Sequence, residues 1–360
     1  MSIKSLVVRK LKAAYKKRVR KQMKKSIAHG HYDVSTIDAN VADYRKQGFS
    51  MSESANLELN KNDYRDYIST WESMLPRIDN PMSAYFPVAD DKYLFYLTFS
   101  HFVKTPLCYA LIHNGEVVWI DNQNEKEDIY DFCLKHKKMV IKDRKGADGF
   151  SVYVFEAVDG VLHYKDKPVS RAEMTGIVSK FSNGLVQECL EQGSFANALY
   201  PRTINTVRVI TIRPKDAVEH EVCAAIQRFG TSVSYPVDNF HQGGGCCLID
   251  LETGELDEMI TRSQKDDSGH YYFSDCHTDT GAQIKGKVIP HWAELKKGLI
   301  DLTRKLPFFE YIAWDIVLLD EGFAVIEINM KSSLDIFQMK HPQRHTMLGK
   351  LYREHGWLEN

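Results

Sequence analysis

The chain has 360 residues, 43% of them hydrophobic and 26% charged, and a formal net charge of −1. This length and composition predict a packed globular protein of one large domain or two to three small ones. No apolar run approaches the length that spans a bilayer, and Leu6-Val7-Val8 is too short for the apolar core of a signal peptide. These features argue against integral-membrane and secreted classes and favour a soluble, intracellular protein.

Charge and cysteine content indicate a cytoplasmic protein with a basic N-terminus. Residues 1–25 carry eleven Lys or Arg and no acidic residue, so the net charge divides into +11 for this segment and −12 for the other 335 residues. The seven cysteines are odd in number and include no Cys-x-x-Cys spacing. Such a set is typical of reduced, mostly buried thiols in the cytoplasm.

The basic segment predicts a helix over residues 3–25. Ile3, Val7 and Leu11 fall near helical spacing, and cations fill most of the remaining positions. Such a helix could lie on anionic lipid or on an acidic partner surface, or it could be a solvated helix docked on its own domain. Nucleic acid is not an expected partner, because no aromatic-plus-basic module follows and the rest of the chain is acidic.

The region up to residue 103 predicts helices in a polar, irregular sequence. Short helical patches are expected near 41–46 and 62–74. Residues 90–103 then form an amphipathic pattern, and Asp90 or Asp91 directly before it supplies a helix cap.

Two strand pairs follow, and the second contains a loop rich in glycine and lysine. CYALIH and EVVWI flank Asn114-Gly115, the strongest short hairpin signal, and 123–137 predicts a helix. A strand then ends in Lys142, and a second strand follows a loop with Lys145, Gly146, Asp148 and Gly149. Backbone N–H groups and lysine ammoniums in such a loop could hold a triphosphate. An ordinary hairpin loop is the alternative.

The middle of the chain predicts strands that carry isolated polar residues. GLVQECLEQG (184–193) begins as a buried strand with Gln187 and Glu188. NTVRVITIRP (205–214) is a convincing strand that carries Arg208. An arginine on an apolar strand must find an anion or project to the sheet edge.

Glycines and polar residues dominate the next stretch. After a strand near 222–229, the segment DNFHQGGG (238–245) has three consecutive glycines, which predict close backbone approach to a ligand or to another chain segment. Residues 265–285 are polar and predict a loop. A zinc site of His270, Cys276 and His277 is rejected, because the paired ligand spacing is missing. Further helices are expected over 171–181, 291–305 and 342–358.

The most informative stretch, Tyr311 to Gln338, predicts a hairpin of the strands WDIVLL and FAVIEIN. A three-residue turn with a left-handed Gly322 would pair Leu319 with Phe323 and place Asp315 opposite Glu327. A two-residue turn would send Asp315 to the other face of the sheet.

With the longer turn, Asp315, Glu327 and Asn329 converge on one buried surface, because alternate residues of a strand share a face. Two carboxylates and an amide are hard oxygen ligands that suit Mg²⁺ or Mn²⁺. The alternative is an edge hairpin whose acids face water.

The order of these segments matches a known superfamily. Over roughly residues 90–340 the chain resembles the ATP-grasp superfamily and, within it, the sugar-transfer-associated branch. The matching text is VIKDRKGADG, LVQECLEQG, LYPRTINTVRVITI, DNFHQGGG, CHTDTGAQIKGKVIPHW and YIAWDIVLLDEGFAVIEIN. The resemblance implies an α+β protein in which two α+β subdomains clasp ATP, with a smaller N-terminal region and a basic N-terminal helix.

The resemblance also implies roles for individual residues. Its catalytic cations are Arg208, Lys142 and Lys145. Its metal ligands are Asp315, Glu327 and Asn329. Its ATP-binding set comprises the phosphate lysine, the mobile lid, the hinge strand and a polar loop: Lys142, Lys145, Gly146, Asp148, Gly149, Gln187, Glu188, Cys189, Leu190, Asn239, Gln242 and Gly243.

One departure concerns an arginine that many family ligases carry two residues before the metal-binding aspartate. This chain has Ala313 there. Arg208, or a donor from Asn239 to Gly245, could supply the missing charge near an acyl phosphate.

We expect five segments along the chain. They are a basic helical extension (1–40), an N-terminal α/β region (41–120), a first ATP-grasp subdomain with the lid and hinge strand (121–195), a second with the metal and substrate site (196–345), and a C-terminal helix (346–360).

The implied activity is ATP- and Mg²⁺-dependent ligation of a carboxylate to an amine through an acyl phosphate, in capsule or cell-surface polysaccharide biosynthesis. The substrates would be small-molecule or glycan-precursor acids and amines. Two alternatives stay open: an ATP-dependent kinase of a sugar or small acid, and a non-catalytic adaptor that docks on a membrane or a glycosyltransferase. Residues 1–25 would make that contact, at the inner face of the membrane.

Overall fold

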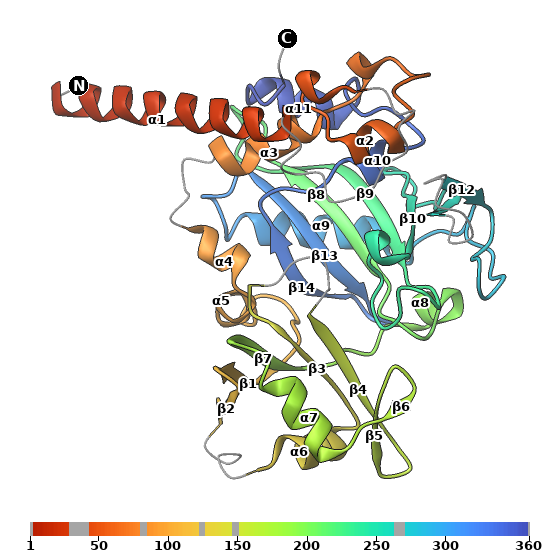
Figure 1. Ribbon diagram of the computed structural model, residues 1–360. Helices are drawn as coiled ribbons and strands as arrows, with labels where there is room; N and C mark the ends of the chain where they lie inside the picture. Colours follow the sequence, from red (N-terminus) through yellow and green to blue (C-terminus); the bar gives the residue numbers. More distant parts are fainter. Residues whose placement is uncertain are drawn as a thin grey trace.

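Two antiparallel sheets form the body of the protein, one above the other in Figure 1. The computed structural model describes residues 3–28, 43–79, 85–121, 127–145, 151–262 and 271–358. The predicted loop residues Gly146, Asp148 and Gly149 therefore lie outside the described residues.

The first sheet has the strand order β2-β1-β7-β3-β4-β5-β6. Helices α6 (Ile129–His136) and α7 (Arg171–Val178) contribute Phe132 and Met174 to the core that buries Ile141. The strands are β1 (Cys108–His113), β2 (Glu116–Trp119), β3 (Lys138–Asp143), β4 (Val152–Val158), β5 (Val161–Tyr164), β6 (Lys167–Pro168) and β7 (Asn183–Glu188).

The second sheet has the order β12-β11-β10-β9-β8-β13-β14 and is covered on both faces. Its strands are β8 (Thr206–Ile212), β9 (Glu221–Phe229), β10 (Gly245–Leu248), β11 (Met259–Arg262), β12 (Tyr271–Ser274), β13 (Tyr311–Leu318) and β14 (Phe323–Asn329). Its covering helices are α3 (Thr70–Asp79), α5 (Lys92–Phe99), α9 (Trp292–Thr303), α10 (Asp335–Gln338) and α11 (Met347–Glu354).

The side-chain alternation of β13 explains this two-sided burial. Trp314 and Ile316 join the core made with α5 and α9, which we call the α9 face. Tyr311 and Ala313 join the core made with α3, α10 and α11, which we call the α10 face. Because alternate residues share a face, Asp315 belongs to the α10 face.

The N-terminal helix α1 (Ile3–Ala28) meets the body only near its C-terminal end, and the rest projects outward in Figure 1. Ile27 is buried in the α10-face core, and Met23 packs against it. The predicted helix is thus confirmed. No helix in the described ranges combines the length and apolar character that a bilayer crossing needs.

Most predicted elements are confirmed, including both hairpins and the Asp91 cap of α5, whose carboxylate accepts the Tyr93 N–H at 3.0 Å. The predicted loop over 265–285 is wrong in part, because β12 pairs with β11 inside it. The predicted helix over 342–358 is limited to Met347–Glu354. Helices α2 (Met51–Asn56), α4 (Phe86–Asp90) and α8 (Ser194–Leu199) and the 3₁₀ turns η1 (Arg45–Gln47), η2 (Tyr64–Asp66) and η5 (Phe240–Gln242) complete the main elements.

Candidate active site

The β13–β14 hairpin places Asp315 directly opposite Glu327, as the sequence predicts. The predicted turn is wrong, however. Leu318, not Leu319, pairs with Phe323, and the pairing shifts by one residue between Asp315 and Ile316. The longer turn shifts the strand register by one residue, and the irregularity shifts it back by one. Asp315 therefore still lies opposite Glu327. Gly322 has the expected left-handed backbone, with φ of 74°.

Arg208 on β8 forms an ion pair with Asp315 on the adjacent strand β13. The two residues are paired in register, the guanidinium Nε donates to Asp315 Oδ1, and Nη2 donates to Oδ2 at 2.7 Å. Nη1 of Arg208 also donates to Ser332 Oγ at 3.2 Å. This arrangement meets the expectation that an arginine on an apolar strand must find an anion.

A second arginine reaches the same carboxylate from β9. Arg228 Nη2 lies 3.5 Å from Asp315 Oδ2, and its Nε donates to Thr206 Oγ1 at 2.7 Å. Burial alone would raise the pKa of Asp315, but the charges of the two arginines and the hydrogen bonds from Arg208 outweigh it and lower that pKa. Asp315 is therefore a buried, ionised carboxylate.

Glu327 and Asn329 extend the polar cluster along β14. Asn329 Nδ2 donates to Glu327 Oε1 at 3.3 Å, so the two side chains share a face. Lys92 Nζ, at the start of α5, lies 3.5 Å from Glu327 Oε2. Glu327 keeps 28% of its side chain exposed, whereas Asp315 keeps 2%. The cluster thus runs from the protein interior to solvent.

This donor set fits Mg²⁺ or Mn²⁺. Asp315, Glu327 and Asn329 bring oxygen donors to one face, and hard divalent cations prefer oxygen ligands. Among the described residues no group of three or more His, Cys, Asp or Glu side chains could hold an ion, so this candidate depends on two carboxylates and the Asn329 amide. Two carboxylates and one amide, each binding through one oxygen, leave half of an octahedral shell to phosphate oxygens and water.

Lys142 lies near this cluster from the other sheet. It belongs to β3, and burial followed by the charge of Lys92 lowers its pKa to about 8, against the opposing influence of Glu327. Two lysines and two arginines therefore lie among three carboxylates, because Arg228 Nε is also 3.5 Å from Asp238 Oδ2. One positive charge is in excess, which favours the binding of phosphate. Lys145 is exposed at the edge of the described residues, beside the predicted lid.

The predicted hinge residues lie at the end of β7, where the chain leaves the first sheet. Gln187 is buried; its Nε2 donates to Cys108 Sγ at 3.3 Å, and its Oε1 has no hydrogen-bond donor within the described residues. Glu188 accepts the Leu107 N–H at 3.1 Å. Cys189 is buried, and Leu190 packs on Val317 and Ala324 of the second sheet.

The glycine run has a structural explanation in its own chain. Gly243 has φ of 98°, and a Cβ on Gly244 would lie 2.8 Å from Phe229 O at the end of β9. Asn239 caps the 3₁₀ turn by accepting the His241 N–H at 2.8 Å. Of the two predicted causes of glycine here, approach to another chain segment is therefore confirmed. The nucleotide roles of Asn239, Gln242 and Gly243 stay predictions.

Sequence reasoning missed Lys92, Arg228 and Ser332. Arg228 carries the same signal that identified Arg208, a cation on an apolar strand, and could have been found. Lys92 reads as an ordinary first residue of a helix, and Ser332 as part of a connection, so only their contacts with Glu327 and Arg208 reveal them.

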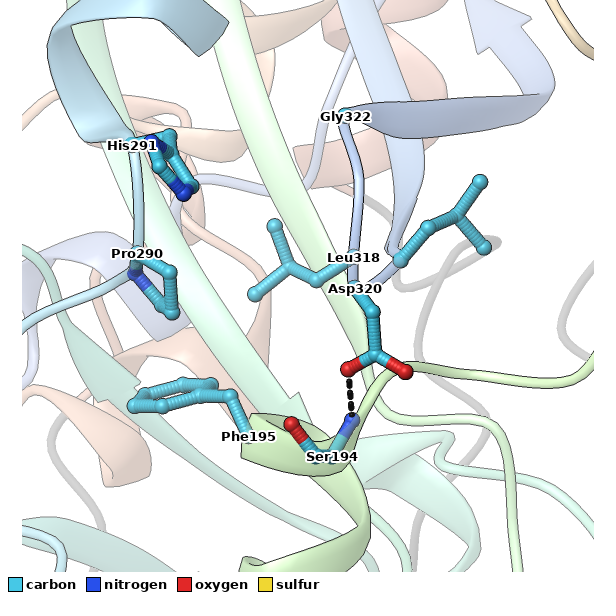
Figure 2. A pocket seen from close by; sticks show the side chains of 8 residues that line it. Ser194, Phe195, Pro290, His291, Leu318, Asp320 and Gly322 are labelled. Atoms are coloured by element: carbon cyan, nitrogen blue, oxygen red, sulfur yellow. Dashed lines mark hydrogen bonds between the residues drawn. The ribbon is translucent and has the colours of Figure 1, made fainter.

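A small pocket lies away from this cluster, at the turn of the β13–β14 hairpin. Figure 2 shows Ser194, Pro290, His291 and Asp320 around a space of about 90 Å³. Asp320 Oδ1 accepts the Ser194 N–H at 2.6 Å, which ties α8 to the hairpin turn. The two segments pack closely at this contact, because a Cβ on the neighbouring Gly193 would lie 2.6 Å from Leu319 C.

Comparison with known proteins adds a family match. The model of a family described as sugar-transfer associated ATP-grasp matches residues 74–348. A search of the curated proteins found no match.

Several solved structures are similar at low identity. The ADP complex of purK, an N5-carboxyaminoimidazole ribonucleotide synthetase, is 12% identical with a TM-score of 0.38, over 72% of this chain and 48% of that one. D-alanine–D-alanine ligase from Bacillus anthracis is 13% identical with a TM-score of 0.38, over 81% and 71%. The ATP-grasp ligase PsnB, with a phosphomimetic variant of its minimal precursor, Mg and ADP, is 14% identical with a TM-score of 0.40, over 77% and 61%. The chain thus spans about half of the purK chain.

Proposed function

The chain belongs to the sugar-transfer associated ATP-grasp family, and from that premise we propose that it is an ATP-dependent ligase that joins a carboxylate to an amine. The observation that carries the proposal is the polar cluster of Asp315, Glu327 and Asn329, surrounded by Arg208 and Lys142. Carboxylate and cationic groups in this arrangement suit the binding and transfer of a phosphoryl group.

The proposed reaction has two steps. An oxygen of the substrate carboxylate attacks the γ-phosphorus of ATP, the bond to the β-phosphate oxygen breaks, and ADP leaves. The amine nitrogen then attacks the acyl carbon, the bond to phosphate breaks, and the nitrogen loses a proton. Both steps spread negative charge over phosphate oxygens, so fixed cations and correct positioning supply most of the catalysis.

Lys142 and Lys92 would bind the nucleotide phosphates, because both cations lie near Glu327 where the two sheets approach. Gln187 Oε1 is a buried acceptor that an adenine amino group could satisfy. Asp315, Glu327 and Asn329 would hold Mg²⁺, which when bound withdraws charge from the phosphates. Lys145, Gly146, Asp148 and Gly149 would close over the nucleotide.

Arg208 and Arg228 would replace the arginine that this family often places at position 313. Ala313 is fully buried, and its methyl side chain carries neither a charge nor a hydrogen-bond donor. Arg208 donates to both oxygens of Asp315, whereas Arg228 makes only longer contacts with carboxylates, 3.5 Å to Asp315 Oδ2 and 3.5 Å to Asp238 Oδ2. Arg228 is therefore the better candidate to turn toward an acyl phosphate.

The test is ADP release by the full chain with ATP, Mg²⁺ and a panel of uronic acids, amino acids and amines. A ligase needs both an acid and an amine for full turnover. A kinase of a sugar or small acid would give a stable phosphorylated product without any amine, and that result would replace the ligase proposal. The proposed setting, capsule or cell-surface polysaccharide synthesis, rests on the family's sugar-transfer association.

Helix α1 supports a separate attachment role at an anionic membrane surface. Eleven basic residues lie within residues 1–25, and the body carries the opposite charge. Deleting residues 1–25 should weaken binding to anionic vesicles and leave ATP turnover in solution nearly unchanged. A large loss of turnover would contradict this role.

A further inference from the structure

Asp238 is an acidic residue beside the candidate active site that neither the proposed metal site nor the proposed nucleotide site uses. It follows β9 along the chain and begins the glycine-containing segment 238–245. Thr206 on β8 fixes one carboxylate oxygen of Asp238. The Thr206 backbone N–H donates to Asp238 Oδ2 at 2.8 Å, and the Thr206 hydroxyl donates to the same oxygen at 2.5 Å.

The other oxygen, Asp238 Oδ1, is accessible to a ligand. It accepts no hydrogen bond from the residues that the structure describes, and the side chain keeps 11% of its surface exposed. Unlike a fully buried orphan atom, Oδ1 can bind water when no ligand is present, so its open state costs little. What points to a ligand is therefore the position of this carboxylate and not the missing hydrogen bond.

One guanidinium group connects Asp238 with the proposed metal site. Arg228 Nε lies 3.5 Å from Asp238 Oδ2, and Arg228 Nη2 lies 3.5 Å from Asp315 Oδ2. The pairing of β8 with β13 places Thr206 opposite Val317, two residues along from the pair of Arg208 and Asp315. Asp238 and Asp315 thus lie at opposite ends of one short, planar group, within the span of a single reacting substrate pair.

The proposed ligation requires an anionic group at such a place. An aliphatic amine is a cation at neutral pH, and the lysines and arginines of the active site repel it. A carboxylate oxygen can accept hydrogen bonds from an ammonium group and can also take its proton. Asp315 belongs to the proposed metal site, so Asp238 is the carboxylate at Arg228 that is left for the amine.

We propose that Asp238 binds the amine substrate of the ligase through Oδ1 and accepts its protons. This assignment rests on the proposed ligase function. One proton of the ammonium passes to Oδ1 and on to water, and the neutral nitrogen attacks the acyl carbon. The carbon–oxygen bond to the phosphoryl group breaks, and its electron pair leaves with phosphate. The nitrogen loses its second proton by the same route.

Two nucleophiles test the assignment with the full chain, ATP, Mg²⁺ and an acid that supports ADP release. Hydroxylamine is uncharged at neutral pH and traps an acyl phosphate as a hydroxamate, so it depends little on a carboxylate for binding. Asp238→Asn should form hydroxamate within about threefold of the wild-type rate. With the amine that supports turnover, its rate of amide formation should fall by about 100-fold or more, and the KM for that amine should rise.

A matched control separates this role from a structural one. The side-chain amide introduced by Asp238→Asn still offers Thr206 an oxygen, so the Tm should stay within a few degrees of wild type. Asp279→Asn is the control, because Asp279 also accepts a loop N–H, that of Ser232 at 2.5 Å, but is exposed. This control should form both products at wild-type rates.

The two products also distinguish failure of the assignment from failure of the ligase proposal. Equal losses of hydroxamate and amide in Asp238→Asn would mean that Asp238 only positions Arg228, which overturns its role toward the amine. Amide formation by this variant at the wild-type rate would overturn that role while the ligase function stands. If wild type formed neither product, the proposed ligase function would fail, and the assignment of Asp238 with it.

Discussion

Buried carboxylates occur at two places on the same face of the second sheet, and their surroundings shift the pKa in opposite directions. Asp315 receives two arginines, and their charges lower its pKa although burial acts against this. Glu53 on α2 accepts hydrogen bonds from the Thr70 backbone N–H and hydroxyl, and burial, then the charge of Asp335, raises its pKa to about 8. Burial is common to both, so the supply of cations decides the protonation state.

The two groups therefore lose stability at opposite ends of the pH range. Asp315 contributes stability that is complete above its unfolded pKa of about 3.8 and is lost as the pH falls through its lower folded pKa. Glu53 contributes stability that is complete below 4.5 and is lost as the pH rises through 8. The ionised group can serve a reaction at neutral pH, whereas the protonated one holds α2 in place.

The largest effect should follow removal of the arginine-paired carboxylate. Asp315→Ala should lower ATP-dependent ADP release by about 10³-fold or more, because the proposed metal site loses a carboxylate ligand and the charge of the phosphates is less well stabilised. It should also destabilise the protein by about 3–5 kcal/mol, because Arg208 loses its carboxylate partner in a largely buried place, whereas Arg228 retains Asp238 at 3.5 Å. Urea unfolding and ADP release measure the two effects.

Glu327→Ala is the matched control for this experiment. It removes a carboxylate of the same proposed metal site, but Glu327 is 28% exposed and its Lys92 contact is long, at 3.5 Å. We expect a similar loss of ADP release with a stability change below about 1 kcal/mol. Equal destabilisation by both variants would contradict the contrast between the buried and exposed ends of the cluster.

A smaller effect is expected at the buried cation. Lys142→Met keeps most of the length of the side chain and removes its charge, so the KM for ATP should rise by about 10- to 100-fold, equivalent to about 1.4–2.8 kcal/mol. Because the pKa of Lys142 is lowered to about 8, wild type should also lose ATP affinity as the pH rises above 8. Lys142→Met should lack this alkaline loss, and its retention would assign the titration to another group.

Sequence reasoning found the ionised cluster better than the protonated one. Asp315, Glu327 and Asn329 stand in one hairpin, so strand alternation alone placed them together, although a wrong turn and an unforeseen irregularity compensated each other. Glu53 and Asp335 come from opposite ends of the chain and meet only through tertiary packing. No local pattern encodes that meeting, and the same holds for Lys92 beside Glu327.

Glu53→Gln tests the protonated group directly. The amide mimics the protonated carboxyl and keeps an acceptor for Thr70, so stability below pH 5 should be almost unchanged. Between pH 5 and 8 wild type should lose stability and the variant should not, with a difference on the order of 2–4 kcal/mol at pH 9. Equilibrium unfolding over this pH range is the measurement.

The exposed Glu58→Gln provides the control on the same short segment, since Glu58 pairs only with the exposed Lys61. Its pH profile should follow that of wild type. If Glu58→Gln also flattened the profile, the pH dependence would not arise from the burial of Glu53.

The smallest effect is expected at an acid that is neither buried nor crowded. Asp166, in the turn between β5 and β6, pairs with Arg202, whose guanidinium also lies 4.3 Å from the Tyr235 ring centroid. This contact joins the first sheet to a loop that leads into the second, yet the two side chains are 67% and 43% exposed. Water screens such pairs, so Asp166→Asn should cost about 0.2–1 kcal/mol, with little pH dependence above pH 5. Unfolding at two salt concentrations measures this effect. The difference in unfolding free energy between Asp166→Asn and wild type should be smaller in 0.5 M salt than in 0.05 M salt, because salt screens exposed pairs. If Asp166→Asn lowered the free energy of unfolding by more than about 2 kcal/mol, an exposed carboxylate would matter as much as a buried one. The contrast between buried and exposed carboxylates would then fail.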